Sequence, residues 1–142
     1  MTTTPPIRAG QCLAYGLLGL PLAFVALPLY VLLPNHYARE FGMPLATLGS
    51  VLLAARLLDA VSDPLLGRLS DYLFGRSVRA VLAVGAVSAV VLALGLTSLF
   101  FPQVRGADAL IAWALVALLI TYTAYSQLGI AHQSWGARLG GD

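Results

Sequence analysis

Three ionisable residues lie on one face of a long apolar segment. Arg56, Asp59 and Asp63 are spaced i, i+3 and i+7, so in a helix they fall within about 60° of one another. Charged residues in such a segment cost about 2.5–3.5 kcal/mol each on insertion scales and usually mark an ion or substrate pathway. The spacing predicts that Arg56 pairs with Asp59. Asp63 then leaves an excess negative charge, which attracts a cation or takes up a proton.

The backbone next to these acids offers a further candidate ligand. Pro64 follows Asp63 directly, and because proline has no N–H, the carbonyl of Ala60 loses its usual helical partner. Carboxylate and carbonyl oxygens together suit a hard monovalent cation in a membrane helix. The alternative is a structural ion-pair network between helices, and the spacing alone does not separate the two interpretations.

The segments that position these residues have the composition of a membrane protein. Of the 142 residues, 59% are hydrophobic and 10% are charged, against roughly 45–50% and 25% in soluble domains. A bilayer needs about 20 apolar residues per helix, and four runs are long enough. These predicted spans cover residues 11–33, 45–70, 78–101 and 108–131. We therefore predict an all-α membrane protein in which the whole chain, 1–142, forms one four-helix unit.

Positive charge comes from eight arginines and no lysine. They are scattered, whereas nucleic-acid binding requires a basic patch, so we expect no nucleic-acid partner. Short loops on the cytoplasmic side of a membrane carry an excess of arginine. Five arginines fall on the side of the two chain ends: Arg8, Arg68, Arg76, Arg79 and Arg138. Because only Arg39 and Arg105 fall on the other side, we predict that both termini are cytoplasmic.

The sequence offers little support for an enzyme. It has one cysteine, Cys12, so neither a disulfide nor a zinc site can be built within the chain. No nucleophile and base pair, metal cluster or phosphate-binding glycine loop is recognisable. His36 and His132 have no partner at metal-ligand spacing, and we expect both on the surface. We therefore predict no catalytic residues, no metal and no cofactor.

Polar side chains gather on the fourth predicted span. Their hydroxyl and amide groups suit hydrogen bonds to a polar solute, although bonds between helices explain them about as well. The candidates for a solute cavity are Tyr122, Tyr125, Ser126 and Gln127.

Several motifs, taken together, resemble one transporter family. Residues 55–67 read ARLLDAVSDPLLG, which resembles the second-helix signature of the glycoside–pentoside–hexuronide:cation symporters, the melibiose-permease-like group of the major facilitator superfamily. The residues that follow resemble the superfamily's loop between helices two and three: Gly67, Asp71, Gly75 and Arg76. AYG at 14–16 and HQSWGARL at 132–139 resemble the start of helix I and the end of helix IV.

The resemblance implies a secondary active transporter in a bacterial inner membrane. Asp59 and Asp63 are expected to bind the coupling Na⁺, Li⁺ or H⁺, with Arg56 as their charge partner. Asp71 and Arg76 are expected to form a cytoplasmic gate. The implied substrate is a small polar solute such as a sugar.

The resemblance also implies twelve helices, of which this chain would supply helices I–IV. We therefore expect an N-terminal fragment that is inactive without helices V–XII of the same protein. The rival interpretation is a self-standing four-helix protein that oligomerises, either a small multidrug exporter or a structural subunit. Small exporters of that type rely on an acid in their first helix, and residues 11–33 contain none.

Overall fold

The computed structural model describes residues 8–139, and every regular element there is helical. Four stretches are long and apolar enough to cross a membrane: Ala9–Glu40, Leu45–Arg76, Val78–Phe100 and Ala107–Arg138. The prediction of an all-α protein with four candidate spans is thereby confirmed. The elements in chain order are α1 (Ala9–Leu27), η1 (Pro28–Leu32), α2 (Leu33–Glu40), α3 (Leu45–Arg76), α4 (Val78–Phe100) and α5 (Ala107–Leu139).

The first span is longer than the sequence suggests and changes its winding halfway. At η1 the N–H of Leu33 bonds to the carbonyl of Pro28, five residues back, which makes one π-helical turn. Proline removes a helical donor, and π turns accommodate such a loss. Pro34 stands where we predicted a loop, but it lies in the first turn of α2, where a helix tolerates proline. The span therefore continues to Glu40.

The end of α3 also differs from the sequence prediction. Residues 71–77 were expected to form a loop, but α3 runs through Arg76, and Ser77 alone separates it from α4. The Ser77 hydroxyl accepts a hydrogen bond from the Ala80 N–H at 3.1 Å and caps α4. No proline interrupts 68–76, and Gly75 does not adopt a positive φ. Nothing in this segment therefore breaks the helix before Ser77.

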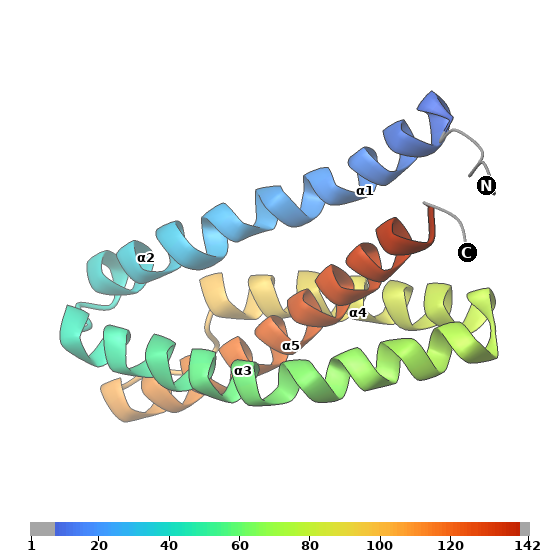
Figure 1. Cartoon of the computed structure of the whole chain (residues 1–142). Helices are drawn as coiled ribbons and strands as arrows, with labels where there is room; N and C mark the ends of the chain where they lie inside the picture. Colours follow the sequence, from blue (N-terminus) through green and yellow to red (C-terminus); the bar gives the residue numbers. More distant parts are fainter. Residues whose placement is uncertain (1–7, 140–142) are drawn as a thin grey trace.

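Helix α5 is the centre of the bundle. Both α3 and α4 pack along it, and α3 and α5 run in the same direction (Figure 1). It continues to Leu139, well past the predicted end at residue 131. Thr121 on α5 is fully buried, and a Cβ atom on Gly95 of α4 would overlap its hydroxyl. A glycine at 95 therefore lets the two helices approach closely, as membrane packing requires.

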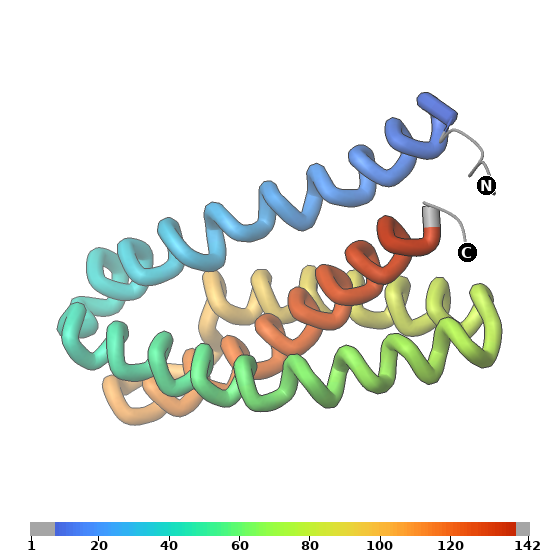
Figure 2. Tube along the Cα trace, viewed as in Figure 1, coloured from blue at the N-terminus to red at the C-terminus, as the bar shows by residue number. Residues whose placement is uncertain are grey.

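The first span is held at one end and spread away from the bundle at the other. Buried apolar residues gather where η1 and α2 meet α3 and α5, including Leu29, Leu33 and Tyr37. No residue of α1 is fully buried. Figures 1 and 2 show α1 diverging from α3 and starting at the end of the bundle where α5 finishes. The first span is therefore anchored to the bundle mainly through η1 and α2.

Candidate functional site

Asp59 is the most deeply buried acid in the described part of the chain, with 4% of its side chain exposed. Arg56 Nη1 donates to its Oδ2 at 3.0 Å, and the Ser126 hydroxyl of α5 donates to its Oδ1 at 3.1 Å. The Ser62 hydroxyl bonds to the Asp59 carbonyl at 2.9 Å. The spacing predicted the pair with Arg56. Ser126 was predicted to line a solute cavity, but here it bonds to the acid.

Arg56 lies against two tyrosine rings as well as Asp59. Its Cζ is 5.0 Å from the ring centroid of Tyr30 and 5.5 Å from that of Tyr122, within the range of a cation–π interaction. The Arg56 side chain is 54% exposed. A guanidinium has five N–H donors, and one of its nitrogens is bonded to Asp59. Arg56 thus presents further donors at an accessible surface inside the membrane-spanning region.

The tyrosines form one cluster from two spans. Tyr30 of η1 lies 5.9 Å from Tyr122 and 6.4 Å from Tyr125, between ring centroids. The Tyr125 hydroxyl donates to the carbonyl of Leu22 at 3.2 Å and so ties α5 to α1. Tyr30 was missed by the sequence analysis, because no local pattern marks it and only helix packing brings it to Arg56. Tyr122 and Tyr125 lie at this cluster, as a solute cavity would require.

Asp63 has an unsatisfied carboxylate oxygen. Its side chain is half-buried, and within residues 8–139 its Oδ1 is shielded from solvent without a hydrogen-bond partner. Such a carboxylate oxygen can accept a hydrogen bond. Asp63 follows Asp59 by one helical turn, on the same side of α3. Ala60, whose carbonyl we considered as a third ligand, lies on the exposed side of α3.

Gln127 is the remaining polar candidate on α5. It is buried, and its Oε1 has no partner among the described atoms. No hydrogen bond joins it to Arg56 or Asp59 in the part of the chain that the structure describes. The structure therefore does not bring Gln127 into the cluster.

The residues predicted to form a gate lie within helix α3. Gly67, Asp71, Gly75 and Arg76 all belong to its last turns, and Asp71 and Arg76 are exposed. Arg76 Nη1 donates to the Tyr72 hydroxyl at 2.9 Å. The predicted loop is thus a helix end that faces solvent or lipid headgroups.

Both histidines are half-buried and have partners on other helices, which the prediction of surface positions did not include. His132 of α5 stacks on Tyr15 of α1, with ring centroids 4.1 Å apart and planes inclined by 10°, and its Nε2 lies 3.0 Å from the Tyr15 carbonyl oxygen. His36 Nε2 lies 3.0 Å from the carbonyl oxygen of Phe100 at the end of α4. These contacts form only when distant helices meet, and the sequence spacing carries no sign of them.

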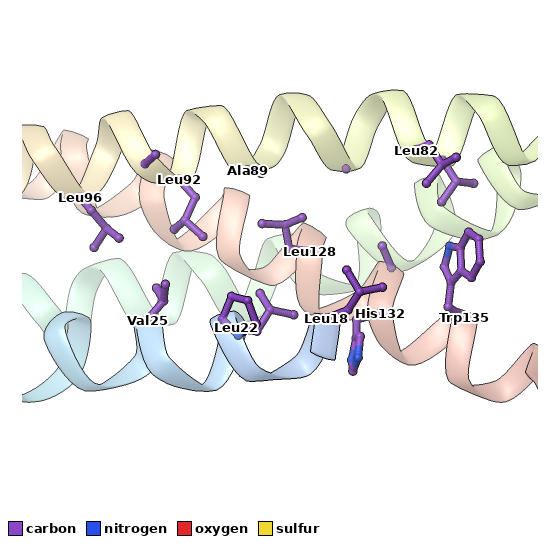
Figure 3. A pocket seen from close by; sticks show the side chains of 15 residues that line it. Leu18, Leu22, Val25, Leu82, Ala89, Leu92, Leu96, Leu128, His132 and Trp135 are labelled. Atoms are coloured by element: carbon purple, nitrogen blue, oxygen red, sulfur yellow. The ribbon is translucent and has the colours of Figure 1, made fainter. Parts of the chain in front are cut away.

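An apolar groove of about 460 Å³ lies between α1, α4 and α5 (Figure 3). His132 and Trp135 are its polar members, and both lie toward one end (Figure 3). The other lining residues are Leu18, Pro21, Leu22, Val25, Val81, Leu82, Gly85, Ala89, Leu92, Ala93, Leu96, Leu128 and Ala131. Arg56, Asp59 and Asp63 are not among them, so the groove is separate from the polar cluster.

Within residues 8–139, no group of three or more His, Cys, Asp or Glu side chains is arranged to hold a metal ion.

Comparison with known proteins gives one match. A family described as MFS/sugar transport protein matches residues 12–142. No curated protein and no solved structure matches the chain significantly.

Proposed function

The chain belongs to the MFS/sugar transport protein family, and from this membership we propose that it takes part in cation- or proton-coupled symport of a small polar solute. As a member of that family it is a multi-pass integral membrane protein and a transporter, not an enzyme. Coupling requires an ion site on the chain. Binding of a sugar-like solute requires hydrogen-bond donors and apolar side-chain faces that fit it.

The unpartnered Oδ1 of Asp63, one turn from the buried Asp59, is the observation that carries the proposal. With Arg56 paired to Asp59, the cluster keeps one negative charge in a region where charge is costly. Na⁺, Li⁺ or H⁺ would each neutralise that charge. We propose Asp63 as the residue that first receives the coupling ion, with Asp59 as the second carboxylate of the site.

The tyrosine cluster around Arg56 supports a sugar-like solute. Tyrosine rings offer flat apolar faces with a polar rim, which match the C–H face and hydroxyl edge of a sugar ring. Arg56 supplies N–H donors beside Tyr30 and Tyr122. We propose that these three residues contact the solute together with Tyr125. Gln127 is a further candidate on α5, although no hydrogen bond joins it to them among the residues described.

We propose that transport requires further helices besides these four spans. The large groove is apolar, and Arg56 is half exposed, so the spans by themselves do not surround a polar path. We propose that helices equivalent to V–XII complete the path, and that this chain alone binds ions but does not transport.

The ends of the bundle support a membrane orientation. Arg68, Arg76, Arg79 and Arg138 lie where α3 ends, α4 begins and α5 ends, the end at which α1 also starts (Figure 1). The positive-inside rule then places this end in the cytoplasm, and we propose a bacterial inner membrane. Asp71 and Arg76 would act as gate residues there, as exposed groups near the cytoplasmic surface.

Ion binding by the purified chain in lipid nanodiscs tests the proposal. Na⁺ and Li⁺ are titrated against choline by calorimetry, and the carboxyl band in infrared spectra reports a proton. We expect Asp63→Asn and Asp59→Asn to abolish binding, whereas Asp108→Asn, an exposed acid at the far end of the bundle, binds like wild type. Unaltered binding in both cluster variants would rule out the ion site. Solute uptake by liposomes that contain only this chain would favour the self-standing oligomer.

A further inference from the structure

Arg56 provides the positive charge that neutralises the buried Asp59 carboxylate. Its Nη1 lies 3.0 Å from Oδ2, and Ser126 takes Oδ1, so both oxygens of the carboxylate are in use. We propose that Arg56 is a tethered cation that competes with the coupling ion for Asp59, and that the first span sets the strength of this competition through Tyr30. The inference rests on the proposed ion site at Asp59 and Asp63.

Competition follows from charge and geometry. An ion that enters at Asp63 acquires a second carboxylate only if it reaches Asp59, one turn away. A metal ion and a guanidinium bound to the same carboxylate oxygen would repel each other strongly in a region of low dielectric. The ion can therefore bind Asp59 only when Arg56 has released that carboxylate. In the ion-free state Arg56 instead limits the unbalanced charge of the cluster to one carboxylate.

The two tyrosine rings hold Arg56 in its competing position. Tyr30 belongs to η1 of the first span, and Tyr122 belongs to α5. Each ring attracts the guanidinium by its π face, so the rings stabilise the arrangement in which Arg56 reaches Asp59. Removal of one ring should therefore weaken the pair and free the carboxylate for the ion.

Tyr30 makes this competition depend on the first span. That span packs on α3 through α2, whereas α1 diverges from α3 (Figure 1). The contact between Arg56 and Tyr30 is thus a bridge from η1 to the ion site of α3. A movement of the first span that withdraws Tyr30 would raise ion affinity. By reciprocity, ion binding would favour the same movement.

Ion affinities of matched variants test the inference. They are measured by titration of Na⁺ and Li⁺ against choline, with the whole chain in nanodiscs at pH 8. If Asp59 is free of Arg56 for about a tenth of the time or less, Arg56→Gln tightens binding by about tenfold or more. Tyr30→Leu tightens it by about two- to fivefold, the equivalent of one exposed cation–π contact. Tyr30→Phe keeps the ring face that lies against Arg56, so its ion affinity lies closer to that of wild type than the affinity of Tyr30→Leu does.

A second readout follows Arg56 itself, so that the result does not depend on the folding of a variant. Phenylglyoxal modifies free guanidinium groups, and mass spectrometry measures its adduct on the peptide that contains Arg56. In the wild type, saturating Na⁺ should speed this modification severalfold. In Asp59→Asn it should be fast without Na⁺. Arg105, an exposed arginine in the loop before α5, serves as the internal control and should not respond.

The outcomes separate the two proposals. If neither Na⁺ nor Li⁺ binds to the wild type, the metal-ion form of the proposed function fails and this inference fails with it. If an ion binds but Arg56→Gln has unchanged or weaker affinity, only the competition is overturned. Slower or unchanged modification of Arg56 in saturating Na⁺ overturns it as well. Equal ion affinities in Tyr30→Leu and Tyr30→Phe would show that the first span does not affect the competition.

Discussion

Ser126 of α5 and Asp59 of α3 are joined by a 3.1 Å hydrogen bond although 67 positions separate them in the sequence. Together with Arg56, Ser126 holds the buried carboxylate from two helices. Neither α3 nor α5 alone would satisfy both oxygens. The charge arrangement at the site therefore depends on the packing of the two parallel helices.

Loss of the Ser126 hydroxyl should destabilise the protein. In Ser126→Ala one oxygen of a carboxylate that is 4% exposed would have no donor, which costs about 1–3 kcal/mol. We expect denaturant unfolding of the chain in detergent to shift by that amount. Ser126→Thr keeps the hydroxyl and should lie near wild type. If Ser126→Ala lowers the free energy of unfolding by the same amount in the Asp59→Asn background, the Ser126 hydroxyl stabilises the protein through a different partner.

A side chain at position 95 should lower the stability of the protein. A Cβ atom there would overlap the hydroxyl of the buried Thr121, and overpacking of this kind costs about 1–3 kcal/mol. We expect Gly95→Ala to lower the unfolding midpoint in detergent. Gly85→Ala on the same helix adds a Cβ with no atom within 4 Å and is the control. The cost of Gly95→Ala should fall when Thr121→Ala is present, and a cost that is strictly additive would contradict the contact.

His132 should control how firmly α1 lies on α5. Its stack on Tyr15 and its contact with the Tyr15 carbonyl join the helices beyond the point where Tyr125 bonds to Leu22. An aromatic pair and a hydrogen bond are each worth about 1 kcal/mol, together about 2 kcal/mol, so His132→Ala should speed amide exchange in the first two turns of α1 by about thirtyfold. His36→Ala, at the opposite end of the span, should leave those amides unchanged.

A larger side chain at Gly136 should open the same contact. A Cβ atom there would lie 2.5 Å from the Tyr15 hydroxyl oxygen, so Gly136→Ala should raise exchange in the same turns of α1. Protection equal to wild type in both Gly136→Ala and His132→Ala would mean that other contacts hold α1 in place.

Local patterns in the sequence predicted the spans and the polar stripe of α3, because both depend on residues close together in the chain. Hydrophobic runs marked the four helices, and the i, i+3 spacing placed Arg56 beside Asp59. Helix ends were less predictable: the polar residues near Gly75 resemble a loop, yet no residue there interrupts helical hydrogen bonding. The partners of Asp59, Arg56 and His132 on other helices depend on packing register, which a single sequence does not encode locally.

The orientation of the bundle gives a prediction that is independent of ion binding. Ser77, between α3 and α4, and Gln103, between α4 and α5, are exposed at opposite ends of α4. The arginine distribution predicts that Ser77 lies on the cytoplasmic side. The natural Cys12 is first replaced in Cys12→Ser, and Ser77→Cys or Gln103→Cys is then added. In intact spheroplasts an impermeant maleimide should label only the Gln103→Cys chain, and both chains should react after lysis.

Labelling of Ser77→Cys in intact spheroplasts would reverse the orientation and move Asp71 and Arg76 to the outer surface. The assignment of these two residues to a cytoplasmic gate would then be lost, whereas the proposed ion site at the middle of α3 would be unaffected.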